Sequence, residues 1–256
     1  AAWQRAAQIY AGRQDMVNMA KYYEGLIQNF PKASPAALAE AHFLLGRAAF
    51  DQGDFKSSIS HMAEAKTLDP QKYGEQVNVL SVLSYHKLQD VNKLKEALET
   101  LQKENPSAVA RVPDVIPAWL GLQAYGMKDL ETADKYMTWA TQNDQLQNVK
   151  KVIWRNLAKV RLALKKYDRA LVASNNFLKD EDQPYRRADG MLDKASILLG
   201  LGKYADARKT AEEALALGVE GPLMASLKIV LGDISYAEKK FDEAAKHYGV
   251  TAEMFV

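Results

Sequence analysis

The segment Ala39–Pro70 reads AEAHFLLGRAAFDQGDFKSSISHMAEAKTLDP, and it decides the fold. Small and apolar residues recur at helical spacing on both sides of Gly53, which predicts two amphipathic helices joined by a tight turn. Gly53 can adopt the positive φ that ends a helix. Pro70 cannot continue the second helix, so the chain turns again there. The small residue Gly46 lets the two helices approach closely, and we predict a helical hairpin as the structural unit.

This pattern resembles the tetratricopeptide repeat, in whose frame Leu45 and Gly46 take positions 7 and 8. The frame recurs along the chain, and its position-7 residues are Ala6, Leu45, Ser81, Leu120, Leu157, Lys194 and Leu231. They are 36 to 39 residues apart, whereas the family repeat has 34, so longer loops or helix ends are expected. The predicted repeats span 1–31, 39–70, 75–106, 114–145, 151–182, 188–219 and 225–256.

The resemblance implies an all-α fold over residues 1–256, a right-handed superhelical solenoid of about fourteen helices in antiparallel pairs. The position-7 leucines Leu45, Leu120, Leu157 and Leu231 are expected to be buried, and the alanines Ala133, Ala170, Ala207 and Ala244 are expected at close helix contacts. The stretch Asn105–Pro117 holds three prolines and is the expected irregular joint, which could separate three repeats from four.

Composition narrows the function classes. The 256 residues are 48% apolar and 26% charged, as in folded globular proteins. The net charge of +2 gives no reason to expect a nucleic-acid partner. No apolar run is long enough to span a bilayer, so no membrane insertion is expected. The absence of cysteine excludes disulfides, thiolate catalysis and cysteine-based zinc sites.

The two ends of the sequence lack the features expected of natural chain ends. The start, Ala1-Ala2-Trp3-Gln4, resembles neither a signal peptide nor a native start, so a leader or a further domain is expected before it. No polar capping helix follows the last repeat, so the chain is expected to be truncated at Val256. Nothing in the sequence separates a cytoplasmic from a periplasmic location.

No catalytic or metal motif is present. The histidines His42, His61, His86 and His247 include no pair four residues apart, so we expect surface or groove residues rather than metal ligands. The run Gly200-Leu201-Gly202-Lys203 looks like a phosphate-binding loop. It lacks the earlier glycine and has Tyr204 where Ser or Thr is required. It also falls where the repeat needs a turn, as Gly12, Gly53 and Gly126 do. We predict no enzyme and no cofactor.

In the family, the first helix of each repeat lines a concave groove at about positions 2, 5, 9 and 12. These positions predict an apolar and aromatic groove in repeats two to four, followed by basic residues in repeat five. The predicted partner-binding residues are Phe43, Arg47, Phe50, Val79, Leu83, His86, Leu122, Tyr125, Arg155 and Lys159. In the later repeats, the groove positions include Val152, Leu192, Ser196, Leu199, Ile229, Asp233 and Tyr236. Either a partner helix or extended peptide contacts this face, or the longer repeats bury it between neighbouring helices.

A basic stripe follows in repeat five. Lys151, Arg155 and Lys159 lie four residues apart and hence on one helical face. One interpretation is an acidic ligand. The other, which we favour, is that Asp189 and Asp193 on the next first helix pair with Arg155 and Lys159.

The predicted function is a non-catalytic scaffold or adaptor that binds another protein or peptide through its concave groove. The alternative is a bacterial structural protein that uses its convex face or edges, with possible self-assembly. Such a protein could be filament-associated, like the bacterial proteins likened to kinesin light chains. It could also act in envelope assembly, because Phe30–Pro35 leading into Ala41–Gly46 looks like repeats of bacterial envelope-assembly proteins.

Overall fold

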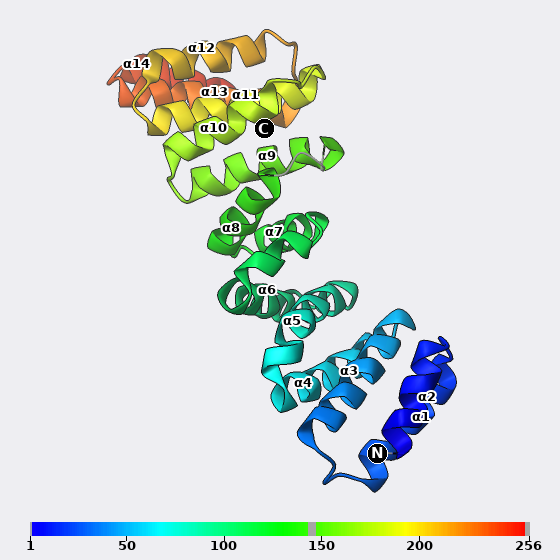
Figure 1. Cartoon of the computed structure of the whole chain (residues 1–256). Coiled ribbons are helices and arrows are strands. Elements are labelled where there is room, and N and C mark those ends of the chain that lie inside the picture. The colour runs from blue at the N-terminus through cyan, green and yellow to red at the C-terminus, as the bar shows by residue number, and fades with distance from the viewer. Residues whose placement is uncertain (1, 143–146, 254–256) are drawn as a thin grey trace. The chain divides into compact units, whose positions relative to one another are not determined.

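The computed structural model describes residues 2–142 and 147–253. These residues form fourteen α-helices and one short 3-10 helix, with no β-strand among them (Figure 1). In chain order the elements are α1 (Ala2–Gly12), α2 (Met16–Asn29), α3 (Pro35–Asp51), α4 (Phe55–Leu68), α5 (Pro70–Lys87), α6 (Val91–Glu104), η1 (Pro106–Arg111), α7 (Val115–Gly126), α8 (Leu130–Thr141), α9 (Gln147–Ala163), α10 (Tyr167–Leu178), α11 (Pro184–Gly200), α12 (Tyr204–Leu215), α13 (Gly221–Ala237) and α14 (Phe241–Glu253). The predicted repeat limits at residues 1, 145 and 256 lie outside the described residues. The all-α fold predicted from the sequence is confirmed.

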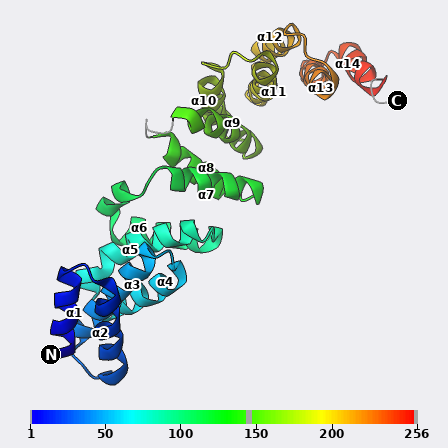
Figure 2. The ribbon, with the colours of Figure 1, turned by 90° about the vertical axis from the view of Figure 1, so that its right-hand side faces the viewer.

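Consecutive helices form pairs, from α1 with α2 to α13 with α14, and both views show the members of each pair side by side (Figures 1 and 2). The chain divides into two compact units, Ala1–Ile116 (unit 1) and Pro117–Val256 (unit 2). The division falls at the end of the proline-rich stretch 105–117, which contains η1. A single array over the whole chain remains a prediction.

The turns inside the pairs share one conformation. In every turn, one residue has φ between 55° and 82°: Gln14, Gly53, Gln89, Lys128, Lys165, Gly202 and Lys239. The next residue donates its backbone N–H to a carbonyl five residues earlier, as Asp54 does to Ala49 at 2.8 Å. This hydrogen bond closes a Schellman-type helix end. The prediction for Gly53 is therefore confirmed, whereas Gly12 and Gly126 end their helices and leave the left-handed position to Gln14 and Lys128.

The residues that cap the second helices fall into two groups. In the first four pairs, an aspartate carboxylate accepts a hydrogen bond from the backbone N–H three residues later, at 3.0 to 3.2 Å: Asp15, Asp54, Asp90 and Asp129. In the last three pairs, lysine takes that place, and neither Lys166 nor Lys203 makes a side-chain cap bond. These three helices carry acidic residues in their first turns instead, which also favours the helix N-terminus.

Several first helices begin with proline. Pro35, Pro70 and Pro184 are the first residues of α3, α5 and α11, where a missing backbone N–H costs nothing. These helices have 17 or 18 residues and begin four or five residues before the predicted repeat starts at 39, 75 and 188. The additional turn of helix explains why the repeats are longer than 34 residues.

The core follows the repeat frame. Leu45, Leu120, Leu157 and Leu231 are buried, as are Ala133, Ala170, Ala207 and Ala244, so these predictions are confirmed. Glycines allow close approach at position 8. A Cβ on Gly121 would meet the backbone nitrogen of Met137 at 2.9 Å, and one on Gly46 would meet the Cβ of His61 at 3.1 Å. These positions of the repeat frame therefore identify residues that pack between the two helices of a pair.

In unit 1, the carboxylate of Glu40 ties the first three helices together. It accepts hydrogen bonds from Gln4 at 3.0 Å, from Gln8 at 2.7 Å and from the hydroxyl of Tyr23 at 2.8 Å. Burial raises the pKa of Glu40, but the three hydrogen bonds outweigh it and the pKa lies below its usual value. The ionised carboxylate thus stabilises the α1–α2–α3 contact.

Candidate partner-binding surface

In unit 1, the predicted groove aromatics pack against their own chain. Phe43 of α3 stacks on Tyr73 of α5, with ring centroids 4.6 Å apart. Phe50 meets Phe55 edge-on across the turn, at 5.4 Å. Both predicted residues are half-buried. In this unit, neighbouring helices therefore cover much of the predicted apolar face.

The remaining predicted residues of unit 1 differ in access. Leu83 and His86 are half-buried and Arg47 is exposed. Val79 is only 5% exposed, so its prediction as a groove residue is wrong. The reason is that α5 contacts α3, α4, α6 and η1, so more than one of its faces is covered.

In unit 2, Leu122 and Tyr125 of α7 are half-buried and pack against the core cluster that contains Leu157 and Ala158.

The basic stripe of α9 is paired with its neighbours. Arg155 forms an ion pair with Asp189, and Lys159 Nζ lies 3.7 Å from Asp193 Oδ2.

Lys151 donates a hydrogen bond to the backbone carbonyl of Asp180. The interpretation in which α11 supplies the acids is thus the one that the structure shows, and an acidic ligand is not needed to explain the stripe.

Among the residues that form ion pairs between α9 and α11, Asp193 has an energetically unfavourable environment. Burial raises the pKa of Asp193 to about 6, although the cations of Lys159 and Arg155 act in the opposite direction. Its Oδ2 atom is buried without a hydrogen bond. The ion pairs between α9 and α11 therefore include one carboxylate whose charged form is destabilised by burial.

An apolar stripe stays accessible on α13. Ile229 and Tyr236 are 41% and 62% exposed, and Asp233 lies between them on the same helical face. We call Ile229, Asp233 and Tyr236 the α13 stripe. Two aromatic residues of α14 adjoin it: Phe241 meets Tyr236 edge-on at 5.4 Å, and the hydroxyl of Tyr248 donates a hydrogen bond to Asp233 at 2.7 Å.

The equivalent stripe of the preceding repeat is covered. On α11, Leu192, Ser196 and Leu199 occupy the same frame positions and are half-buried. Leu192 and Leu199 pack against a cluster that includes Leu227 and Leu231 of α13. A first helix therefore covers the stripe of the one before it, whereas no helix of the described chain covers the α13 stripe to the same extent.

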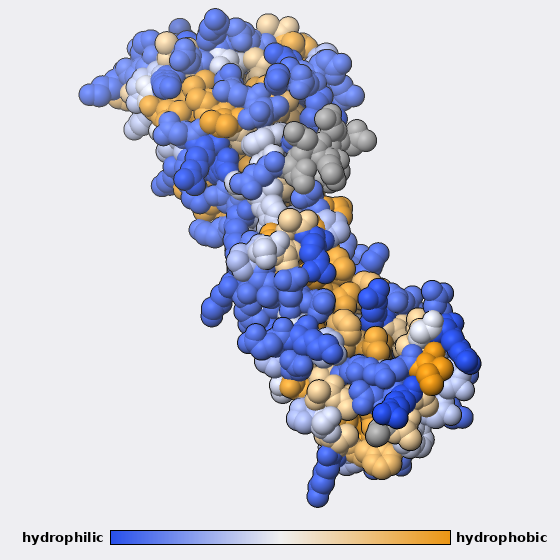
Figure 3. Space-filling view, in the orientation of Figure 1, coloured by the Kyte–Doolittle hydropathy of each residue, from blue (hydrophilic) through white to orange (hydrophobic). Residues whose placement is uncertain are grey.

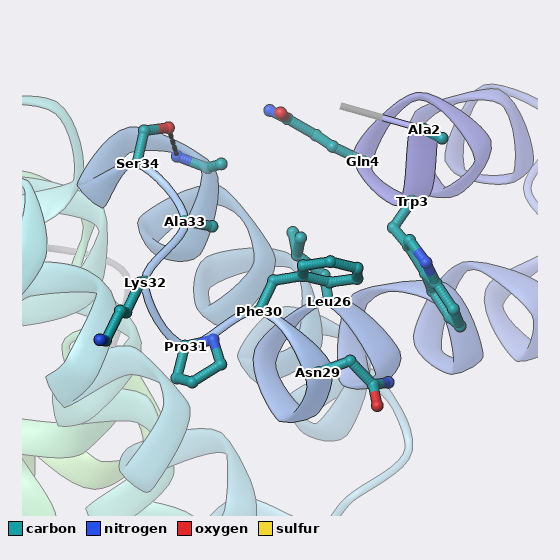
Figure 4. A pocket seen from close by; sticks show the side chains of 11 residues that line it. Ala2, Trp3, Gln4, Leu26, Asn29, Phe30, Pro31, Lys32, Ala33 and Ser34 are labelled. Carbon is teal, nitrogen blue, oxygen red and sulfur yellow. Dashed lines mark hydrogen bonds between the residues drawn. The ribbon is translucent and has the colours of Figure 1, made fainter.

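A cavity of about 840 Å³ opens at the start of unit 1, between α1, the end of α2 and the start of α3. Leu26 and Phe30 lie at its centre in Figure 4, between Trp3 and the loop that carries Pro31. Figure 3 shows apolar side chains at this end of the unit. Lys32 is the titratable residue of its lining, so the cavity can hold an apolar group but offers no acid–base pair.

Two histidines that the sequence did not connect lie together in unit 1. His42 of α3 and His61 of α4 have their Nδ1 atoms 3.0 Å apart. Burial lowers the pKa of both rings, and the facing His61 contributes to the shift at His42. Their separation of 19 residues matches no helical metal motif. Only the contact between α3 and α4 reveals this pair.

Among residues 2–142 and 147–253, no group of three or more His, Asp or Glu side chains could hold a metal ion. In the same residues, no helix is long and apolar enough to cross a membrane. The candidate functional surfaces of the described residues are therefore faces of helices.

Two segments match family models of the tetratricopeptide repeat: residues 39–72 in unit 1 and residues 192–250 in unit 2. The second match runs from α11 to α14 and thus includes the α13 stripe. No curated protein sequence matches the chain.

Three solved structures illustrate what the chain is similar to. The chain is similar to a chain of the Naa15/Naa10 structure with bound HypK-THB, at 14% identity and a TM-score of 0.56, over 98% of this chain and 36% of that one. It is also similar to PilF of Pseudomonas aeruginosa, at 18% identity and 0.41, over 83% and 90%. A tetratricopeptide repeat protein of Parabacteroides merdae has 16% identity and 0.41, over 99% and 92%. Residues 39–72 and 192–250 are therefore identified by sequence as repeats of the tetratricopeptide-repeat superfamily.

Proposed function

We propose that the protein is a non-catalytic scaffold that binds an amphipathic α-helix of a partner protein on the first-helix face of its repeats. The α13 stripe is the proposed main contact, with Phe241 beside it. Proteins of this superfamily generally mediate protein–protein interaction, and repeat arrays present extended surfaces for it. The observation that carries the proposal is the exposure of Ile229 and Tyr236 at positions where Leu192 and Leu199 of the preceding repeat are half-buried.

The choice of a helix as occupant follows from the preceding repeat. There the covering element is itself an α-helix, α13, which places Leu227 and Leu231 in the cluster that covers α11. A partner helix with apolar residues at positions i, i+4 and i+7 would reproduce this contact. Tyr236 and Phe241 are suited to anchor it, because aromatic side chains at a desolvated centre supply much of the binding energy.

The predicted groove residues that remain accessible extend the same face within each unit. In unit 2 these are the half-buried Leu122 and Tyr125, together with Val152, which is 42% exposed. In unit 1 they are Arg47, Leu83 and His86. Arg155 and Lys159 would act as charges at the rim of this face, since both are half-buried and paired with α11. A rim of this kind affects orientation and rate more than affinity.

Site-specific photocrosslinking in cells of the source organism tests the proposal. A photoreactive phenylalanine analogue replaces Tyr236 in the full-length protein, and a matched control replaces Val172, which is 56% exposed on the second helix α10. We expect position 236 to crosslink to a partner peptide with an amphipathic helical pattern and position 172 to give no product. Crosslinks from position 172 alone would favour the convex-face or edge alternative.

A further inference from the structure

The histidine pair of unit 1 is part of the contact between the two helices of one repeat. His42 lies on α3 and His61 on α4, and their ring centroids are 5.2 Å apart with planes inclined by 46°. Gly46, one turn after His42, allows this approach, because the His61 Cβ lies only 3.1 Å from where a Cβ on Gly46 would be. The distance of 3.0 Å between the two Nδ1 atoms is a consequence of this close packing.

In the ion-free state, a hydrogen bond between the two Nδ1 atoms requires one ring to be the donor and the other the acceptor. At 3.0 Å, one Nδ1–H donates to the lone pair of the other Nδ1. The accepting ring carries its own proton on Nε2. If the donating ring shifts its proton to Nε2, both Nδ1 atoms present lone pairs between α3 and α4. No net proton is gained or lost in this change of tautomer.

We propose that His42 and His61 form a binding site for a divalent first-row transition metal ion, Cu²⁺ or Ni²⁺. Imidazole nitrogens bind such ions at about 2.0–2.1 Å. Two ligands at right angles on one ion are then about 2.8–3.0 Å apart, whereas a tetrahedral pair is about 3.3–3.4 Å apart. The observed 3.0 Å matches the right angle, which Cu²⁺ and Ni²⁺ adopt in square-planar or tetragonal sites.

The surroundings suit a cation. Glu64 acts electrostatically on both rings, and Glu24 of α2 and Asp54 act on His61, each in the direction that favours positive charge. Glu64 also follows His61 by three residues on α4, and hence lies on the same face. No group of three possible ligands is present among the described residues, so water would fill the remaining positions of a bound ion. The half-burial of both rings leaves the site open to solvent.

The site is independent of the proposed partner contact, because it lies in unit 1 and the α13 stripe lies in unit 2. It also explains a feature that helix packing alone does not require. Two half-buried imidazoles at one helix contact could be replaced by apolar side chains. A pair of neutral imidazoles is the form that metal ions need.

The test is a titration of the untagged protein with CuCl₂ or NiCl₂, followed by calorimetry and, for Cu²⁺, by electron paramagnetic resonance. We expect one ion per chain, with hyperfine coupling to two nitrogens. His42→Ala and His61→Ala should each weaken binding at least tenfold. His247→Ala is the matched control, because His247 is also a half-buried helical histidine but does not face another imidazole. It should bind as the parent does, and Zn²⁺ should bind more weakly than Cu²⁺.

Equal binding by the parent and by both single variants, or no saturable binding up to millimolar ion, would overturn the proposal. A second measurement on the parent avoids dependence on the folding of the variants. In the long-range ¹H–¹⁵N spectrum of the histidine rings, substoichiometric Cu²⁺ should broaden two rings before the other two. His86→Ala and His247→Ala identify the unaffected signals, and broadening of those signals first would equally contradict the site.

Discussion

The first helices of the two units differ in what covers the same face. In unit 1, Phe43 stacks on Tyr73 and Phe50 meets Phe55 edge-on. In unit 2, ion pairs between α9 and α11 cover part of the face, and the α13 stripe stays open. A residue's place in the repeat frame therefore determines which face it occupies. Its access to a partner depends on the side chain that the next repeat supplies.

The largest expected effect concerns the frame that both units share. Leu157→Ala removes a fully buried side chain of unit 2 and should lower the free energy of unfolding by about 2–5 kcal/mol. Leu45→Ala should have a similar effect on unit 1. Urea or thermal denaturation followed by circular dichroism measures both. Variants that melt like the parent would show that these positions are misassigned.

Overpacking tests the close helix contacts. Ala170 is buried between helices, so Ala170→Leu should cost about 1–3 kcal/mol of unfolding free energy. Ala245→Leu is the control, because Ala245 is exposed on α14 and a larger side chain meets solvent there. A thermal melt of each variant gives the comparison. Equal melting temperatures for the two variants would argue against close packing at Ala170.

The two units should respond to pH in opposite directions at two carboxylates. Asp193 of unit 2 has a folded pKa of about 6, above the ordinary value of 3.8. Its favourable contribution to folding is therefore present below pH 4 and is lost as the pH rises through 6. Relative to the parent, Asp193→Asn should gain about 1–3 kcal/mol of stability between pH 4 and pH 7.5. Chemical denaturation at both pH values measures this difference.

Glu40 of unit 1 has a pKa below its ordinary value of 4.5. Its contribution is present above that value and is lost as the pH falls. Glu40→Gln should therefore be destabilised relative to the parent at pH 7, and the difference should shrink towards pH 3. If both variants changed in the same direction with pH, the contrast between the units would be wrong.

The helix caps should give the smallest effect. Asp129 accepts a hydrogen bond from the backbone N–H of Thr132, so Asp129→Ala should cost about 1 kcal/mol of unfolding free energy. Lys203 makes no cap bond, and Lys203→Ala should change little. Lys203→Asp should instead stabilise the protein by introducing the missing cap. Denaturant midpoints of the three variants provide the test, and equal costs for Asp129→Ala and Lys203→Ala would contradict it.

The helix pairs and their turns could be predicted because they depend on local signals. Gly53 and Pro70 mark chain reversals, and the leucines of the frame mark the buried face. Whether a residue of the candidate site is exposed or covered depends on residues of neighbouring helices, which the local sequence does not reveal. Val79 is buried because α5 has neighbours on several sides, and Phe43 is covered by Tyr73. The pairing of His42 with His61 needed the approach of α4 to Gly46.

The most direct test of the central claim is partner capture by the full-length native protein with the α13 stripe altered. The double variant Ile229→Ser/Tyr236→Ser changes two exposed side chains, so the fold should persist, as a thermal melt can verify. The control is Val17→Ser/Val172→Ser, which changes two exposed side chains on second helices. We predict that the stripe variant loses the partner crosslinked at position 236 and that the control retains it. Undiminished binding by the folded stripe variant would contradict the account.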